Sequence, residues 1–390
     1  MSDASGNKIW ANSGDSHIIE PLDLFEKLPE HLRDRMPRSV KDPSGDFETI
    51  YIDGQEFRRE LPKPTPGKER KSGIGINAHP TDATADEFIN RALGGNDPVK
   101  RLADLDEEGV WGEVIYPSLG IWAFNIRTPE VARVGAQALN EFALDFQSDS
   151  PRFVCCASIP LVDVDDAVAE IKRSSNAGFY AGFLPVRPPF GRPEWNDEEW
   201  DPMWAAFAET GMVIGFHIGT EPVDPAGRVG IYYRGRGGAV LNYVETTYGG
   251  QRAVTQVIAC GALDRHPDLR VLVSEGGATW GPFIADRMDE GYRQHGAAVR
   301  PTLSKLPSQY LYEQVYASFQ HDASAVAASS AMGWKNVMWG SDYPHFEGTF
   351  GHTQKTLHEL FDGVNDEISQ RIRIGAFQEL FPHVPALPHS

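Results

Sequence analysis

Eight short apolar runs alternate with segments of helical periodicity, and this alternation restricts the fold more than any other feature of the chain. Several runs are apolar at consecutive positions, which is typical of strands buried on both faces. The repeated strand–helix alternation predicts an α/β fold, a closed (β/α)8 TIM-like barrel in a single domain spanning residues 1–390. The predicted strands are Ile9–Asn12, Val110–Tyr116, Phe153–Ile159, Gly182–Val186, Met212–His217, Arg270–Ser274, Gln314–Phe319 and Val337–Gly340.

Two long segments interrupt the alternation, one after the first strand and one after the fifth. Residues 37–98 are rich in proline, glycine and charge, and we predict a lid-like insertion there. Residues 220–250 combine glycines with tyrosines and arginines, and we predict a substrate-loop insertion. Both insertions leave the predicted barrel as one domain.

The composition narrows the classes of partner. The formal net charge of −19 argues against nucleic acid and against an anionic membrane surface. No apolar run approaches the roughly 18 residues that a membrane span needs. The three cysteines include no CxxC pair, and MSDASGNKIW has no secretion signal, so we expect a cytoplasmic protein that acts on a small molecule.

Imidazole and carboxylate side chains follow several predicted strands at the points where these end. Asp15 and His17 come after the first strand, and residues two apart on an extended segment point the same way. In barrels of this kind, active sites gather at the carboxyl ends of the strands. We therefore expect a divalent metal, and this mixture of donors suits zinc, iron, manganese or nickel. The other candidates at strand ends are His217, Glu275, Asp342 and His345.

Four stretches carry a resemblance to a known family: GDSHIIEP, GFHIG, RHPDLRVLVSEGGATWGP and NVMWGSDYPHFEG. Together they resemble the amidohydrolase superfamily, in particular the branch that includes aminocarboxymuconate-semialdehyde decarboxylase. The resemblance implies a (β/α)8 barrel with one divalent ion, or two, and a homodimer as one assembly. It further implies that the metal ligands are Asp15, His17, His217 and Asp342.

Two departures from the family pattern bear on the chemistry. Asp15 stands where the founding motif of the superfamily has the first histidine of His-x-His. Glu275 stands where many relatives carry a histidine that acts as acid or base. The stretch FLPV at the end of the fourth strand has no lysine near it, so the carbamylated lysine of the two-metal hydrolases is not expected.

Three of the site residues are also candidates for catalysis. Asp342 is expected to bind the ion and to take a proton from metal-activated water. Glu275 has three possible roles, as a general base, as a ligand to a second ion, or as a carboxylate that orients His217. His345 is expected to shuttle a proton or bind metal, the alternative being a hydrogen bond to Glu20 or Asp15.

The substrate contacts are predicted on the loops after strands four and five and near the first strands. Arginines there are expected to bind a carboxylate or a phosphate through a bidentate fork, and aromatic side chains to line an apolar pocket. The alternative for each is a solvated loop charge or ordinary packing. The candidates are Arg187, Arg192, Arg234, Trp122, Tyr232 and Tyr233.

Three reactions are compatible with this set of residues. The leading hypothesis is hydrolysis or hydration by metal-activated water of a small organic acid or ester-like substrate, cyclic compounds included. The first alternative is non-oxidative decarboxylation of an aromatic or unsaturated acid. The second is oxygenation at one or two non-haem irons, because two histidines with several carboxylates also suit iron.

Overall fold

Eight parallel strands form the centre of the structure, a computed structural model. Their order along the sheet is their order along the chain, as in the predicted barrel. All eight predicted strands are confirmed, with ends that differ by one or two residues. The strands are β1 (Ala11–Ser13), β5 (Val110–Ile115), β6 (Phe153–Ser158), β7 (Ala181–Pro185), β8 (Val213–His217), β9 (Val271–Ser274), β10 (Val315–Phe319) and β11 (Val337–Trp339). The structure describes residues 8–21, 23–44, 47–60, 92–222, 233, 235–345 and 347–388.

The first and last strands of the barrel meet through backbone hydrogen bonds. The amide of Gly14, just after β1, donates to the carbonyl of Trp339 at 2.8 Å. Past the ends of both strands, the amide of Asp342 donates to the carbonyl of Asp15 at 2.9 Å. These bonds join β1 to β11 at the carboxyl end of the barrel, so the two segments that carry predicted metal ligands lie side by side.

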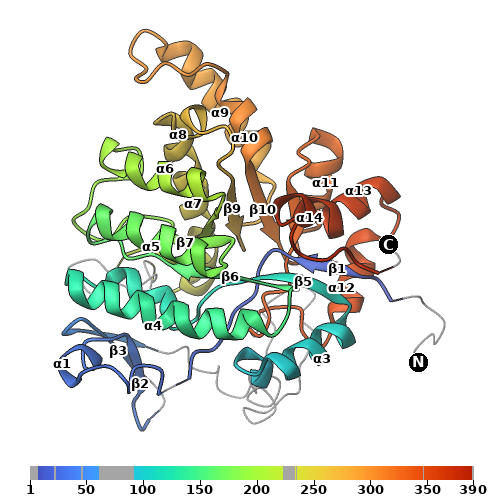
Figure 1. The fold of residues 1–390 in the computed structure, drawn as a ribbon. Helices are drawn as coiled ribbons and strands as arrows, with labels where there is room; N and C mark the ends of the chain where they lie inside the picture. Colours follow the sequence, from blue (N-terminus) through green and yellow to red (C-terminus); the bar gives the residue numbers. More distant parts are fainter. Residues whose placement is uncertain are drawn as a thin grey trace.

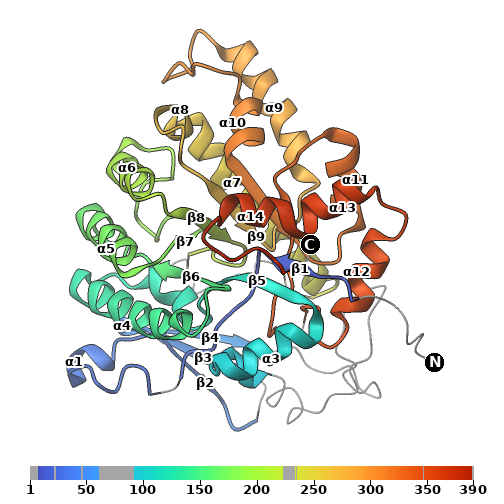
Figure 2. The same ribbon diagram turned by 45° about the vertical axis from the view of Figure 1, so that its right-hand side comes forward.

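Helices lie outside the strands (Figures 1 and 2). Asp163 caps α5 by accepting hydrogen bonds from two backbone amides, and Gly178 ends this helix in the left-handed conformation, with φ of 112°. The helices are α1 (Glu30–Arg33), η1 (Ala92–Gly95), α3 (Pro98–Glu108), η2 (Gly120–Asn125), α4 (Pro129–Ser148), α5 (Val164–Ala177), η3 (Glu198–Trp200), α6 (Asp201–Thr210), α7 (Gly238–Ala259), α8 (Ala262–Arg265), α9 (Trp280–His295), α10 (Pro307–Gln314), α11 (Ala323–Met332), α12 (Thr353–Phe361), α13 (Asp366–Gln370), the π-helical η4 (Arg371–Gly375) and α14 (Ala376–Leu380). Among the described residues, no helix has the length and apolar character that crossing a membrane requires.

The insertion after the first strand forms a separate small sheet. It is antiparallel and consists of β2 (Arg38–Lys41), β3 (Phe47–Ile52) and β4 (Gln55–Glu60). Apolar side chains of this sheet pack against α4 and form a second core cluster. Figure 2 shows the sheet beside α4. The rest of the insertion, residues 61–91, lies outside the described residues. Its function as a lid stays a prediction.

The segment predicted as a substrate loop ends in a helix. α7 begins at Gly238, so the last part of residues 220–250 is helical rather than loop. Two glycines explain the difference. A Cβ on Gly249 would lie 2.6 Å from the Val186 side chain, and one on Gly250 would lie 2.5 Å from Val273. These glycines let the helix approach the barrel, whereas in the sequence they suggest a flexible loop. Residues 223–232 and 234 lie outside the described residues.

Candidate metal centre

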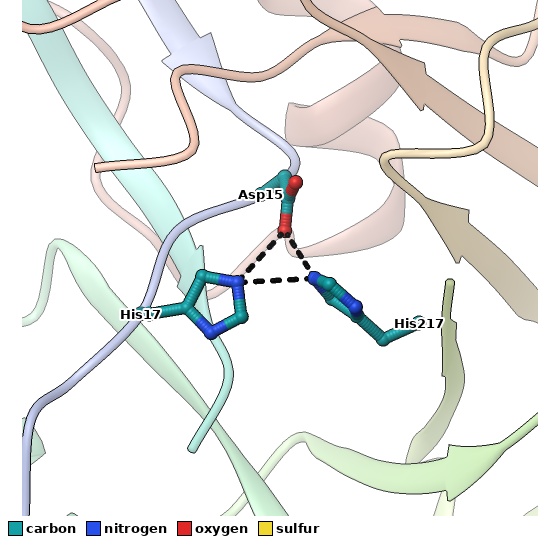
Figure 3. Close-up of side chains that lie close together, drawn as sticks. All are labelled: Asp15, His17 and His217. Atoms are coloured by element: carbon teal, nitrogen blue, oxygen red, sulfur yellow. Dashed lines mark hydrogen bonds and ion pairs between the residues drawn. The ribbon is translucent and has the colours of Figure 1, made fainter. Parts of the chain in front are cut away.

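The predicted metal ligands converge at the carboxyl end of the barrel. Asp15 and His17 follow β1, His217 is the last residue of β8, and Asp342 follows β11. All four side chains are buried. In Figure 3 the carboxylate of Asp15 and the rings of His17 and His217 point toward one another. Strands far apart in the chain therefore deliver these donors to one place.

The two histidines present their Nε2 atoms to a common point. These atoms lie 3.0 Å apart, and the Asp15 Oδ1 atom is 3.3 Å from the His217 nitrogen and 4.0 Å from the His17 nitrogen. The other nitrogen of His217 is 2.8 Å from the Ile218 carbonyl, which fixes the ring and leaves Nε2 for a ligand. Ile218 thus orients this histidine, and the orienting role of Glu275 stays a prediction.

Asp342 connects this group to a third histidine. Its Oδ1 atom lies 3.5 Å from His17 Nε2 and 2.8 Å from His345 Nδ1. The His345 ring stacks on that of His17, with the centroids 4.0 Å apart. The expected alternative partners of His345 were Glu20 and Asp15, and the structure instead places it on Asp342. Asp342 has a φ of 53°, a backbone conformation that residues other than glycine seldom adopt outside functional sites.

The carboxylates of the centre lack the partners that buried charges normally have. Among the described residues, neither oxygen of Asp15 accepts a hydrogen bond, and neither does Oδ2 of Asp342. Burial of a charged group without compensation is expensive, so such atoms indicate a missing positive ligand. With two imidazole nitrogens beside them, these oxygens form a donor set that fits a divalent cation. The chain thus has a His/Asp metal-binding site.

The electrostatic environment favours a neutral imidazole at His17 and a charged imidazole at His345. Burial lowers the pKa of His17 well below its ordinary value, and the neighbouring His345 and His217 lower it further. Burial also lowers the pKa of His345, but the adjacent Asp342 carboxylate outweighs it and raises the pKa to about 9. His17 is therefore in the neutral form that binds metal, whereas His345 forms an ion pair with Asp342.

Glu275 and a residue that the sequence reasoning missed, Glu347, lie at the edge of this centre. Glu275 follows β9 with a φ of 61°, and its Oε2 atom is 3.7 Å from His217 Nε2. Carboxylate oxygens of Glu275, Asp342 and Glu347 all lie within 4.8 Å of one another. Burial raises the pKa of Glu275 well above its ordinary value, and the charges of Asp342 and Asp15 add to this. Glu347 lies in the same family-like stretch as Asp342. Its carboxylate in that stretch is the sequence signal that could have identified it as a site residue.

The two predicted substrate arginines that the structure describes each lie beside carboxylates of the loops after β7 and β8. Arg187 is 3.6 Å from Glu194 and 3.8 Å from Glu221. Arg192 pairs with Glu199 and lies over the Trp200 ring at 5.3 Å. Arg234 lies outside the described residues, and the role of all three in substrate binding stays a prediction.

The predicted aromatic contacts lie in different places. Trp122 lines a pocket of about 220 Å³ between the barrel loops and the small antiparallel sheet, together with Ile19 and Ile50. Tyr233 is exposed, and its hydroxyl is 3.5 Å from Glu245 on α7. Tyr232 lies outside the described residues. The role of these three aromatic residues in substrate binding therefore stays a prediction.

A comparison with protein families identifies the chain. The model of a family described as amidohydrolase matches residues 126–377, more than half of the sequence. The chain belongs to the amidohydrolase family. This assignment confirms the resemblance predicted from the four sequence stretches.

Similar proteins are decarboxylases or amidohydrolases. The chain is 21% identical over 262 residues to a protein named decarboxylase yanB from Aspergillus niger, covering 65% of this chain and 70% of that protein. An amidohydrolase structure from Mycobacterium avium subsp. paratuberculosis has a TM-score of 0.74 at 19% identity, covering 96% of this chain and 100% of that one. A 5-carboxyvanillate decarboxylase from Novosphingobium aromaticivorans with bound manganese has a TM-score of 0.61 at 20% identity, covering 77% and 85%. The structural likenesses support the barrel fold.

Proposed function

We propose that this enzyme is a metal-dependent decarboxylase that releases carbon dioxide from a small aromatic or unsaturated carboxylic acid. The observation that carries the proposal is the convergence of Asp15, His17, His217 and Asp342, with unpartnered carboxylate oxygens, at the active end of the barrel. A divalent ion held by these four residues would supply positive charge that favours a substrate carboxylate. Similarity to decarboxylases supports this reaction over the hydrolysis expected first.

The chain's own residues supply the proton that decarboxylation requires. When the carbon–carbon bond breaks, its electron pair stays on the substrate carbon and carbon dioxide leaves. Glu275 carries the proton that this carbon takes up, because its carboxyl group lies beside His217 at the edge of the metal centre. Water then restores the proton on Glu275. Glu275 thus takes the acid–base position for which many relatives use histidine.

Hydrolysis or hydration would use the same residues in a different way. In that reaction Asp342 would take a proton from the attacking water, and His345, which pairs with Asp342 at 2.8 Å, would pass it to solvent. Both remain predictions from the sequence, and similarity to decarboxylases makes them second to decarboxylation.

Oxygenation with iron is the one alternative that a specific observation favours. Glu275 and Glu347 add two carboxylates beside Asp342. A site with two histidines and several carboxylates suits iron better than catalytic zinc. This alternative requires dioxygen as the oxidant, so oxygen consumption separates it from decarboxylation.

The test is an assay of the purified enzyme loaded separately with Mn²⁺, Fe²⁺ and Zn²⁺ against a panel of hydroxybenzoates and unsaturated acids. We expect stoichiometric carbon dioxide release that is equally fast with and without dioxygen. Oxygen uptake coupled to substrate loss would replace the proposal with oxygenation, and release of an alcohol or amine without carbon dioxide would replace it with hydrolysis. No carbon dioxide from any acid, with metal bound, would refute it.

A further inference from the structure

A tyrosine inside the barrel, Tyr116, connects the segments that carry the metal ligands. It directly follows β5, and its side chain is fully buried. We propose that Tyr116, acting through Ser274, is a positioning residue that holds the Asp15 carboxylate in place for a divalent cation. The inference rests on the metal centre of the proposed function, and it is independent of which reaction the enzyme catalyses.

Two hydrogen bonds form a chain across the barrel interior. The Tyr116 hydroxyl lies 2.8 Å from the Oγ atom of Ser274, which donates to the Gly14 carbonyl at 2.8 Å. A serine hydroxyl carries one hydrogen, and Ser274 uses it for Gly14, so Tyr116 is the donor to Ser274. Ser274 ends β9, and β6, β7 and β8 lie between β5 and β9 in the sheet. The chain therefore joins strands from opposite parts of the barrel.

The chain of bonds ends at the peptide group that carries Asp15. The carbonyl of Gly14 belongs to the peptide bond between Gly14 and Asp15. The next carbonyl, that of Asp15, accepts a hydrogen bond from the amide of Asp342 at 2.9 Å, so the backbone is fixed on both sides of the Asp15 side chain. Neither oxygen of Asp15 accepts a hydrogen bond from the described residues, and this backbone therefore determines where the carboxylate lies.

Tyr116 also contacts both histidine ligands. Its amide donates to the Ser16 carbonyl at 2.7 Å and its carbonyl accepts from the Ile18 amide at 2.9 Å, so two backbone bonds flank His17. Its ring meets the ring of His217 in a T-shaped arrangement, with the centroids 4.8 Å apart. A shift of this tyrosine would therefore displace three of the four ligands.

A glycine in β8 leaves space for the tyrosine hydroxyl. A Cβ on Gly215 would lie 2.7 Å from the Tyr116 hydroxyl oxygen. The φ of Gly215 is outside the left-handed region, so its backbone conformation alone does not require glycine. The strand that ends in His217 thus makes room for Tyr116 to reach Ser274, and this observation is independent of the hydrogen bonds.

The experiment compares two tyrosines whose hydroxyls have different partners. Tyr316 is the matched control, because it is a buried barrel tyrosine whose hydroxyl donates at 2.8 Å to Glu379, which is none of the four ligands. Full-length wild type, Tyr116→Phe and Tyr316→Phe are titrated with Mn²⁺ and followed by electron paramagnetic resonance. We expect the dissociation constant to rise about tenfold or more in Tyr116→Phe and to stay within about twofold of wild type in Tyr316→Phe. The spectrum of the bound ion should change in Tyr116→Phe alone.

A second variant tests the chain of hydrogen bonds itself. Ser274→Ala removes the bond to Gly14, and it should weaken Mn²⁺ binding at least as much as Tyr116→Phe does. The double variant should bind Mn²⁺ no more weakly than Ser274→Ala, because both changes break the same chain. Urea unfolding of the metal-free proteins checks that each variant folds.

The outcomes separate this role from the proposed reaction. Wild-type Mn²⁺ affinity in folded Tyr116→Phe, or equal losses of affinity in Tyr116→Phe and Tyr316→Phe, overturns the positioning role whether or not carbon dioxide is released. If Tyr116→Phe does not fold, wild-type affinity in Ser274→Ala overturns it. A selective loss of affinity in Tyr116→Phe, with no carbon dioxide released by wild type, upholds the role and refutes the decarboxylase.

Discussion

Buried carboxylates in two regions of this barrel differ in whether their oxygens have partners. Outside the group of metal ligands, Glu113 of β5 forms a two-pronged ion pair with Arg101, and Glu20, which follows β1, accepts hydrogen bonds from three consecutive backbone amides. Within that group, Asp15 is equally buried, yet neither of its oxygens has a hydrogen-bond partner among the described residues.

The difference separates buried charges that stabilise the fold from buried charges that are available to bind a ligand. A buried acceptor without a partner costs about 1–3 kcal/mol, and more when it is charged. Partners remove this cost at Glu113 and Glu20. Oxygens of Asp15 and Asp342 have no hydrogen-bond partner among the described residues, so the cost remains there. Those two residues follow the first and last barrel strands, where the backbone joins them. Selection for metal binding explains a cost that stability alone would remove.

The largest expected effect is on catalysis. Asp342→Asn removes the carboxylate that contacts both His17 and His345, and we expect the decarboxylation rate to fall by at least about 1,000-fold. Turnover on the best acid of the panel is measured with saturating metal. Asp322→Asn, which removes an exposed carboxylate that is none of the four metal ligands, should retain wild-type turnover. Turnover of Asp342→Asn within tenfold of wild type would remove Asp342 from the mechanism.

The next largest effect is on stability, at the paired carboxylate of β5. Glu113→Gln leaves the buried guanidinium of Arg101 without its counter-charge, so we expect a loss of about 3–5 kcal/mol in the free energy of unfolding. Urea unfolding of the metal-free protein measures it. Glu130→Gln, at an exposed position in α4, is the control and should change stability by less than about 0.5 kcal/mol. Equal stability of the two variants would contradict the structural role of the pair.

A smaller loss is expected at Glu20. A glutamine there keeps one acceptor oxygen but presents an amide to the backbone amides of Ser118, Leu119 and Gly120. We expect a loss of about 1–3 kcal/mol in the free energy of unfolding. Metal affinity should stay unchanged, because Glu20 contacts none of the four ligands in the described structure. Loss of metal binding in a folded Glu20→Gln variant would show that the two regions are coupled.

The smallest effect is expected at Arg192. Its guanidinium is held by Glu199 and lies over Trp200, so Arg192→Ala should change KM by less than about threefold, or about 0.7 kcal/mol. Steady-state kinetics on the best acid provide the measurement. A rise in KM of more than tenfold would instead support the substrate contact predicted from the sequence.

The barrel and its metal ligands follow from the sequence because both depend on local patterns. Strands buried on both faces are apolar at consecutive positions, as in Phe153–Ser158, and the ligands stand at the strand ends. The sequence does not predict which buried carboxylates lack hydrogen-bond partners, because those partners come from distant segments. Arg101 and Glu113 give no sign in the sequence that they meet.

Two misreadings have physical causes. The glycines at 249 and 250 resemble loop residues, but they belong to α7 and permit its close packing on the barrel. Glu347 was missed because it lies on the loop past Asp342, where no periodicity indicates the direction of a side chain. Only the folded loop brings its carboxylate beside those of Glu275 and Asp342.

The most direct test of the central claim is the free energy of unfolding of wild type and Asp15→Asn, each with and without Mn²⁺. The account predicts that Mn²⁺ at 100 times its dissociation constant stabilises wild type by about 2.7 kcal/mol and leaves Asp15→Asn unchanged. Without metal, Asp15→Asn should be at least as stable as wild type, because it removes a buried charge that accepts no hydrogen bond from the described residues. Equal stabilisation of both proteins by Mn²⁺, with metal-free Asp15→Asn the less stable, would contradict the account.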